Sequence, residues 1–299
     1  MIEENVLTEK SNGEMIGHIV NNLSFKDLVP VILMDQSYGM FFYLDYENDK
    51  PSELKIQSYQ KVVHTEKHNI VVAITRDQMS DMKIKDLDSV DLLYNVLLNE
   101  CQQYMTKAFI SHLKELAEIT YRKSFSKFDK MFSFIYDLFK KKYIKTIKIT
   151  DNKQLLLKIL TECNKITAKS RYGMGDYIVC GAQTYTLLSE NEYFIKNITN
   201  HITPYNSGDM YLAGQLLGNI SVYVDPYMKW AYTTVYVGRK IKENQPGINF
   251  MFNKNGTNIC LLTKGQGVPA INLEFQTTFG DFGQHPEHNY SKFVYKLKK

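Results

Sequence analysis

Residues 169–180 read KSRYGMGDYIVC, and the two glycines in this stretch have two competing interpretations. A dinucleotide-binding loop needs a strand, then Gly-x-Gly-x-x-Gly, then a helix whose N-terminus faces the pyrophosphate. Here Gly173 and Gly175 follow a helix-like segment and precede an apolar run, position 178 is Ile, and no Gly-Lys-Ser/Thr follows. The order suits a helix that ends at a glycine in the left-handed conformation, after which the chain turns into a buried strand. The stretch therefore predicts a structural turn and argues against a nucleotide enzyme.

The segments around this turn predict a mixture of helices and strands. Residues 151–167 (DNKQLLLKILTECNKIT) predict a helix with Asp151 as its N-cap, and residues 184–194 predict another. The rest of the chain is richer in Gly and Pro, and its apolar residues come in short runs typical of strands. The strand candidates are residues 175–183, 219–227, 231–240, 247–253, 258–263, 270–280 and 292–299.

A long helix is predicted earlier in the chain. Residues 76–172 contain neither Pro nor Gly, and Asp86 or Asp88 can cap a helix that starts there. Apolar residues then recur mostly three or four positions apart, as on one helical face. They are Leu87, Val90, Tyr94, Leu97, Cys101, Tyr104, Ala108, Leu113, Leu116 and Ala117. A helix over 85–120 would be about 54 Å long, so it must lie along something large.

The region before this helix predicts a long hairpin. Residues 28–36 (LVPVILMDQ) and 39–46 (GMFFYLDY) look like strands, and 47–54 (ENDKPSEL) is charged and contains Pro51. Residues 55–74 are again strand-like and end in IVVAI. Two strands flanking a charged tip suggest a hairpin that projects from a core. Residues 1–27 are polar with little periodicity and read as an arm.

Residues 130–149 (KMFSFIYDLFKKKYIKTIKI) mix aromatic residues with lysines. Such a stretch could stack on and neutralise nucleic acid. More often it is a solvated face whose side-chain stems pack down on the protein. We favour the second interpretation and keep the first open.

Composition favours a β-rich protein with surfaces suited to protein contacts. The chain of 299 residues is 44% hydrophobic and 13% aromatic, with 21 Tyr and 16 Phe, which favours strands and protein interfaces. A formal charge of +4 is too small for a dedicated nucleic-acid binder. The four cysteines have no metal-site or disulfide spacing, so we expect reduced, buried thiols in a cytosolic environment. No apolar run approaches the roughly 20 residues of a membrane span.

The sequence offers no catalytic, cofactor or metal signature. His64 and His68 lie in a strand-like context and are read as surface histidines, and His285 and His288 lie in a loop punctuated by Gly and Pro and carry little weight as metal ligands. There is no Gly-x-Ser-x-Gly and no cysteine with a nucleophile signature. We expect no catalytic residue, no cofactor and no metal.

Five blocks stand out when the segments are taken in order. They are VPVILMDQSYGMFFYLDY (29–46), residues 74–113, RYGMGDYIVCGAQTYTLL (171–188), GNISVYVDPYMKWAYTTVYVGRK (218–240) and VPAINLEFQTTFGDFGQHP (268–286). In content and order they resemble the major capsid proteins of T-even-like tailed bacteriophages, and they touch most of the chain from about residue 28 onward. The inserted domain that T-even relatives carry has little room in 299 residues, which leaves open whether the chain is the major protein or a vertex paralogue.

The resemblance implies an α+β chain with the Hong Kong 97 fold. That fold has a peripheral domain with a long spine helix and a sheet, an axial domain, an extended loop and an N-terminal arm. On this chain the arm would be 1–27 and the extended loop 36–70. The peripheral domain would combine 28–35, 71–150 and 226–299, and the axial domain would be 151–225.

The resemblance also implies a function. Copies would form the hexamers and pentamers of an icosahedral head that encloses double-stranded DNA, in the virion, after assembly in the host bacterial cytoplasm. Portal, scaffold and decoration proteins would be further partners, packaged DNA would be contacted without sequence specificity, and no membrane would be involved. The alternatives are a vertex (pentamer) paralogue, a nucleic-acid-binding module that uses the lysines of 140–148, and an enzyme without a sequence signature.

Specific residues are expected to carry these roles. The extended loop would contact a neighbour through Phe41, Tyr43, Tyr46, Lys50 and Glu53. The axial-domain turn would be made by Arg171, Gly173 and Gly175, and the spine between Leu97 and Leu116 would give rigidity. Packaged DNA would be faced by Lys140, Lys141, Lys142 and Lys145.

Overall fold

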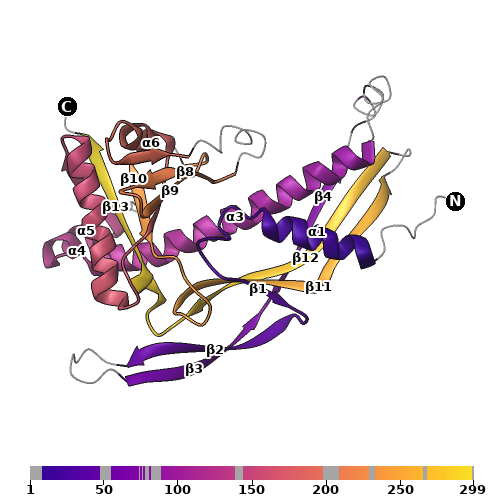
Figure 1. Cartoon of the computed structure of the whole chain (residues 1–299), viewed down its shortest axis with the longest axis horizontal. Helices are drawn as coiled ribbons and strands as arrows, with labels where there is room; N and C mark the ends of the chain where they lie inside the picture. Colours follow the sequence, from indigo (N-terminus) through magenta and orange to yellow (C-terminus); the bar gives the residue numbers. More distant parts are fainter. Residues whose placement is uncertain are drawn as a thin grey trace. The chain divides into compact units, whose positions relative to one another are not determined.

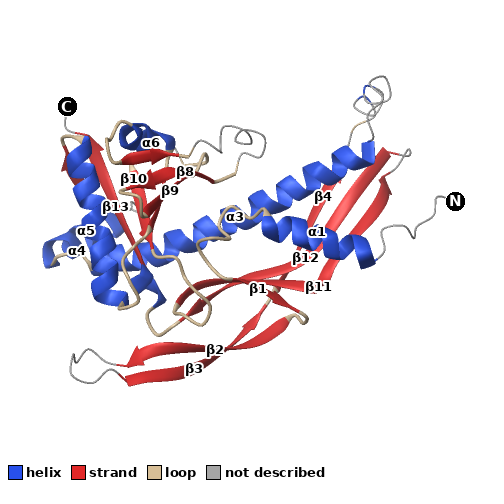
Figure 2. Ribbon diagram, in the orientation of Figure 1, coloured by secondary structure: helices blue, strands red, loops and turns tan. Residues whose placement is uncertain are grey.

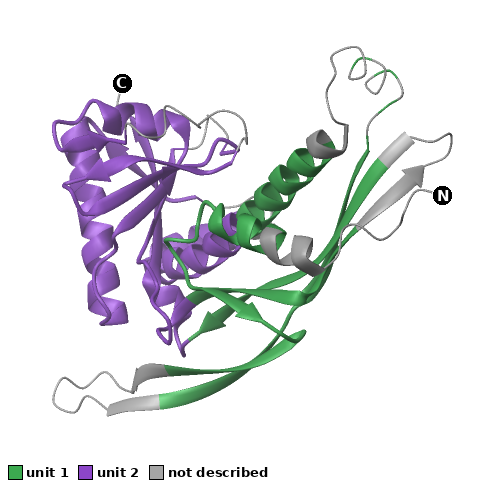
Figure 3. Ribbon diagram, turned by 45° about the vertical axis from the view of Figure 1, so that its right-hand side comes forward, with its two compact units in different colours: residues 1–108, 248–282 green, residues 109–247, 283–299 purple. Residues whose placement is uncertain are grey.

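The computed structural model describes residues 9–47, 55–73, 75, 77, 81, 89–138, 144–197, 209–228, 233–264 and 268–297. The chain divides into two compact units (Figure 3). The first comprises residues 1–108 and 248–282, and the second comprises residues 109–247 and 283–299. Both contain helices and strands, the mixture that the sequence predicts (Figure 2).

The first unit is built on a four-stranded sheet with the order β1-β11-β12-β4. Its strands are β1 (Val31–Met34), β4 (Glu66–Ala73), β11 (Gly247–Lys264) and β12 (Val268–Phe282). The strand β1 runs parallel to β11, whereas β4 runs antiparallel to β12. The predicted strands 247–253 and 258–263 are one continuous strand, although Asn255 and Gly256, residues typical of turns, lie between them.

The predicted hairpin is present as β2 (Tyr38–Glu47) and β3 (Lys55–His64), which pair antiparallel over their whole described length. The strand candidate 55–74 is divided at Thr65, whose backbone N–H donates to the Ser37 carbonyl at 2.8 Å. That contact ends β3, and the chain continues as β4.

The N-terminal segment is not a polar arm throughout, which corrects the prediction for residues 1–27. Residues Glu9–Asn21 form the helix α1, and its Met15 and Ile19 are fully buried. The loop that follows places the Phe25 ring 5.3 Å from Phe250 on β11. The apolar residues of α1 are three or four positions apart among polar ones, so the helical period is present but weak.

The long predicted helix is α3 (Ser89–Lys123), 35 residues and therefore about 52 Å long. Residues up to 108 belong to the first unit and the rest to the second. The buried side chains follow the expected spacing, but the stripe passes through Met105 and Phe109. Tyr104 lies beside the stripe, where its hydroxyl is hydrogen-bonded to His68 Nδ1 at 2.9 Å. The proposed caps Asp86 and Asp88 lie outside the described residues.

The second unit contains a seven-stranded mixed sheet with the order β5-β13-β10-β6-β9-β8-β7, of which Figure 1 labels β8, β9, β10 and β13. Its strands are β5 (Thr146–Ile149), β6 (Tyr177–Cys180), β7 (Phe194–Lys196), β8 (Tyr211–Leu216), β9 (Ile220–Val224), β10 (Thr234–Gly238) and β13 (Tyr290–Leu297). The helical elements are α4 (Lys127–Leu138), α5 (Asn152–Ser170), α6 (Ala182–Ser189) and the 3₁₀ helix η2 (Pro286–Asn289).

The core of the second unit lies between this sheet and the helices α5 and α6. Fully buried Ile159 and Cys163 of α5 and Leu188 of α6 belong to one apolar cluster with residues of β6, β9, β10 and β13. The predicted N-cap of α5 is confirmed, because Asp151 Oδ1 accepts a hydrogen bond from the Gln154 N–H at 2.8 Å. Every residue of β6 is buried, as expected of a central strand.

The compact units do not follow the boundaries predicted at residues 150 and 225. Strands β10 and β13, assigned by the sequence to the peripheral domain, lie in the same sheet as β6, β8 and β9 of the predicted axial domain. The reason is pairing at long range: β10 lies antiparallel between β6 and β13. Sequence order alone does not reveal which of these strands are neighbours.

Candidate assembly surfaces

The stretch 169–180 is a helix-to-strand connection between α5 and the central strand β6. The helix ends at Arg171, which itself adopts the left-handed conformation (φ 62°) and donates its N–H to the Thr167 carbonyl. The prediction that a glycine caps this helix is therefore wrong. Arg171 takes the left-handed cap position, and Gly173 (φ 130°) makes the next reversal of the chain.

Gly175 is required for close approach of α5 to the sheet. Its N–H donates to the Cys163 carbonyl at 3.1 Å, and a Cβ at this position would lie 3.1 Å from the Cys163 Cα. Nothing in this geometry points backbone N–H groups at a phosphate from a helix N-terminus. The stretch therefore joins and packs two core elements.

A buried arginine, which the sequence did not single out, fastens the end of β10. Arg239 donates from Nε to Asn289 Oδ1 at 3.0 Å and from a terminal nitrogen to Gln245 Oε1 at 2.7 Å. Its neighbour Lys240 donates its backbone N–H to Asp176 at 2.7 Å. Burial raises the pKa of Asp176, and the Lys240 N–H and the nearby cations counter that effect. These bonds hold β6, β10 and the start of β13 in register.

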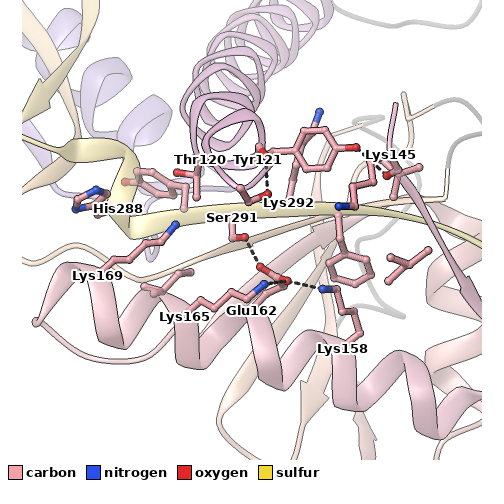
Figure 4. A pocket seen from close by; sticks show the side chains of 16 residues that line it. Thr120, Tyr121, Lys145, Lys158, Glu162, Lys165, Lys169, His288, Ser291 and Lys292 are labelled. Carbon is pink, nitrogen blue, oxygen red and sulfur yellow. Dashed lines mark hydrogen bonds and ion pairs between the residues drawn. The ribbon is translucent and has the colours of Figure 1, made fainter. Parts of the chain in front are cut away.

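A charged cluster of the second unit surrounds a cavity of about 190 Å³ (Figure 4). Its centre is Glu162 on α5, which accepts hydrogen bonds from Lys158 at 2.6 Å, Lys165 at 2.9 Å and the Ser291 hydroxyl on β13 at 2.6 Å. Burial raises the Glu162 pKa, but these three donors outweigh burial, so the pKa lies below its ordinary value. The arrangement ties α5 to β13.

The remaining lysines around this cavity include two with carboxylate partners of their own. Lys292 on β13 binds Glu118 on α3, and Lys145 binds Asp129 at 2.6 Å. Lys145 was predicted to face DNA, which stays a prediction; within the subunit its ammonium is bound to this carboxylate. Lys140, Lys141 and Lys142 lie outside the described residues.

A histidine pair next to the cavity is the strongest metal-like group in the described part of the chain. One ligand atom each of His285, Glu287 and His288 lies within 4.8 Å of the others. However, Lys123 donates to Glu287 Oε1 at 2.5 Å, and a cation already occupies that oxygen. Burial lowers the pKa of His288. We interpret the group as an ion-paired turn.

The hairpin β2–β3 presents two different faces because side chains alternate along a strand. The Tyr43 ring stacks on Phe282 at 5.6 Å and is only 8% exposed, and Phe41 packs against the same ring at 5.5 Å. These two predicted contact residues therefore serve the subunit's own core. The outward face carries Met40 and Phe42, the latter 61% exposed.

The remaining predicted contact residues of the extended loop lie wholly or partly outside the described residues. The side chain of Tyr46 lies outside the described residues, although its backbone pairs with Ile56 in the hairpin. Lys50 and Glu53, at the predicted tip, are outside the described residues altogether. The exposed face of the hairpin was missed because strand alternation does not tell which face is inward. Partners distant in sequence decide this, namely Phe282 and Met251 in the same apolar cluster.

Three of the cysteines are unsuited to nucleophilic catalysis. Cys101, Cys163 and Cys180 are buried, and burial raises the pKa of each thiol to about 12. A thiol that stays protonated at neutral pH is a poor nucleophile. Among the described helices, none has the length and apolarity needed to cross a membrane.

Comparison of the fold with solved structures gives matches that span nearly the whole chain. A protein of Mycobacterium phage Bobi aligns with a TM-score of 0.51 at 7% identity, covering 92% of this chain and 90% of the other. One of Mycobacterium phage Cain aligns with a TM-score of 0.50 at 6% identity, covering 91% and 89%. The chain has the Hong Kong 97 fold.

A third solved structure, the capsid of Myoviridae phage XM1, covers 92% of both chains at 6% identity with a TM-score of 0.46. A search of curated proteins finds no match. The model of one protein family, described as major capsid protein Gp23, matches residues 52–248. These residues are about two thirds of the chain and contain α3, α5, the 169–180 connection and the central strand β6. The chain belongs to the family of the major capsid protein Gp23, whose role is to form a viral shell.

Proposed function

We propose that this chain is the major capsid protein of a tailed bacteriophage and that its copies form the hexamers and pentamers of an icosahedral head around double-stranded DNA. The observation that carries the proposal is the capsid family match across residues 52–248. A hairpin at residues 38–64 and a helix of 35 residues are the two elements that such a subunit would use to overlap and to stiffen the shell.

The division into functional domains is part of the proposal. Residues 36–70, which contain β2 and β3, would be the extended loop. The four-stranded sheet of the first unit with α3 would be the peripheral domain, and the seven-stranded sheet with α5 and α6 would be the axial domain. This assignment moves β10 and β13 from the peripheral to the axial domain, because both pair within the seven-stranded sheet.

The outward face of the hairpin is the surface we propose for overlap with a neighbouring subunit. Met40 and Val62 are paired across the two strands, and both are exposed, as is Phe42 next to them. Apolar side chains that stand together on a solvent-facing sheet are typical of interfaces. Phe41 and Tyr43 would support this face from beneath through Phe282.

Portal, scaffold and decoration proteins and packaged DNA would be the further partners, in a virion assembled in the bacterial cytoplasm. The chain would perform no catalysis. Cys101, Cys163 and Cys180 are protonated at neutral pH, and the lysine cavity has its carboxylate bound by its own side chains. Energy from subunit contacts would be the only driving force that function requires.

Negative-stain microscopy and light scattering of the purified full chain test this function. We expect rings, sheets or closed shells that appear above a threshold concentration. Phe42→Asp should suppress them by placing a charge in the overlap, whereas Val71→Asp, an exposed position on β4, should not. A wild-type chain that stays monomeric at every concentration would refute the capsid function. Salt-sensitive binding of that monomer to nucleic acid would instead favour a binding module.

A further inference from the structure

The cavity beside Glu162 has more cations on its walls than carboxylates. Five lysines line it, and Glu162 is the one carboxylate among the described residues of its lining. The lysines are Lys145, Lys158, Lys165, Lys169 and Lys292. Asp129 and Glu118, which lie outside the lining, bind two of the five. Five ammonium groups against three carboxylates leave an excess of two positive charges.

The position of the cavity follows from the pairing of β13. The strand β5 pairs with β13 only from Val294 onward, whereas β10 pairs with it from Tyr290. Among the described residues, 290–293 therefore have no strand on the side opposite β10, and all four line the cavity. The side chains of Lys158, Glu162, Lys165 and Lys169 follow one another along the side of α5 that faces this part of β13 (Figure 4).

Lys169 carries the excess charge most directly. In the described part of the chain, no residue forms a salt bridge or a hydrogen bond with its ammonium. Lys165 lies one turn earlier on the same side of α5, and like charges at this spacing destabilise a helix. Burial lowers the Lys169 pKa, the Lys165 charge lowers it further, and Glu162 and Glu287 offset only part of this. An anion in the cavity would remove that electrostatic cost.

The ammonium groups are also the donors that remain available. The hydroxyls of Ser291, Tyr121 and Thr120 already donate to acceptors within the subunit. An ammonium has three N–H donors, and Lys165 directs one of them to Glu162 at 2.9 Å. Lys169 and the remaining donors of Lys165 could therefore hold the oxygens of an anion.

The volume of the cavity limits the kind of anion. Sites for drug-sized organic ligands are about 300–1,000 Å³, and this cavity is about 190 Å³. It still far exceeds the roughly 10–15 Å³ that a single water molecule needs. A small oxyanion that carries up to two negative charges matches both the volume and the excess charge, and lysine is a common ligand of phosphate.

We propose that this cavity binds a phosphate ion, held by Lys169 and Lys165 of α5. All the residues of the site belong to the second unit of one subunit. The site therefore adds a ligand to the proposed function and does not depend on assembly.

A ³¹P NMR titration of the full chain with inorganic phosphate, below its assembly concentration, tests the site. Lys169→Gln should raise the dissociation constant at least tenfold, because a hydrogen bond to a charged group contributes about a factor of ten or more. Lys153→Gln is the matched control, since Lys153 lies on the same helix but does not line the cavity. It should change the dissociation constant less than twofold. Equal phosphate binding by the wild type and both variants, or no binding at all, would overturn the proposal.

Thermal unfolding separates ligand binding from a structural role of Lys169. In chloride, Lys169→Gln should be at least as stable as the wild type, because it removes the repulsion with Lys165. Phosphate at equal ionic strength should raise the melting temperature of the wild type more than that of this variant, since a ligand of the folded state stabilises it. A clear loss of stability in chloride would contradict the unpaired ammonium. Stabilisation by duplex oligonucleotide without any by phosphate would overturn the small ion as the ligand. A chain that binds phosphate and never assembles would refute only the shell.

Discussion

Replacing Glu162 by Gln tests whether the charged cluster stabilises the second unit. The Glu162 side chain is 5% exposed, and two lysines and one serine donate to it at 2.6–2.9 Å. Glutamine keeps the volume and can still hydrogen-bond, but it removes the negative charge between two ammonium groups. Only the electrostatic contribution should therefore be lost.

The magnitude follows from the burial of each partner. Breaking a buried ion pair costs about 3–5 kcal/mol when the remaining charge stays buried. Lys158 is 25% exposed and Lys165 is 48% exposed, so both can recover part of their hydration, and we discount the Lys165 pair further for solvent screening. We expect Glu162→Gln to lower the free energy of unfolding by about 2–3 kcal/mol at pH 7.

The pH dependence gives an independent check with a defined sign. The Glu162 pKa lies below its ordinary value of 4.5 in the folded chain, so the unfolded chain binds the proton more strongly. Its contribution to stability is therefore complete well above pH 4.5 and is lost as the pH falls through the folded-state pKa. The stability difference between wild type and Glu162→Gln should be constant from about pH 6 to 8 and shrink below about pH 4.5.

Urea unfolding followed by circular dichroism, at concentrations below assembly, measures both quantities. Lys158→Met alone and combined with Glu162→Gln completes a double-mutant cycle, in which the pair should show a coupling energy of about 1 kcal/mol or more. A Glu162→Gln variant as stable as wild type at pH 7 would refute the reasoning. So would a stability difference that grows in acid.

Four further predictions concern packing and reactivity. Arg239→Lys keeps the charge but cannot reach two amide side chains together, so it should lower the free energy of unfolding by about 2 kcal/mol in urea. Gly238→Ala should cost about 1–3 kcal/mol, because its Cβ would lie 2.3 Å from Tyr177 Cζ. Gly17→Ala, in α1 with no atom within 4 Å of the new Cβ, should instead stabilise by about 0.5–1 kcal/mol, and a loss there would contradict the helix. Iodoacetamide at pH 8 should leave three thiols unmodified in the native chain, as mapped by mass spectrometry, and label them after unfolding; they are Cys101, Cys163 and Cys180.

Local chemistry made several elements predictable from the sequence. The N-cap of α5 at Asp151 depends on residues within a few positions of it, and so does the chain reversal that follows the other end of the helix at Arg171. The length of α3 follows from an apolar period that neither Gly nor Pro interrupts. The hairpin follows from two strand-like runs beside a charged tip. In each case the determining residues are neighbours in the chain, so a single sequence contains the whole signal.

Features that depend on distant partners were not predictable in this way. The inward face of the hairpin is chosen by Phe282, more than 200 positions away, and the placement of β10 is chosen by its pairing with β6 and β13. The phase of the apolar stripe on α3 was missed at Tyr104 because an aromatic residue at helical spacing need not be inward. Here it hydrogen-bonds His68 from the flank of the stripe.

The outward face of the hairpin belongs to a third category, in which the sequence signal is clear but one subunit leaves the face exposed. Strand alternation places Met40 and Phe42 on this face, and Val62 pairs with Met40 across the two strands; all three side chains are exposed. Apolar side chains that stand together on a solvent-facing sheet are typical of interfaces. For a shell-forming chain, such a face is therefore evidence about assembly.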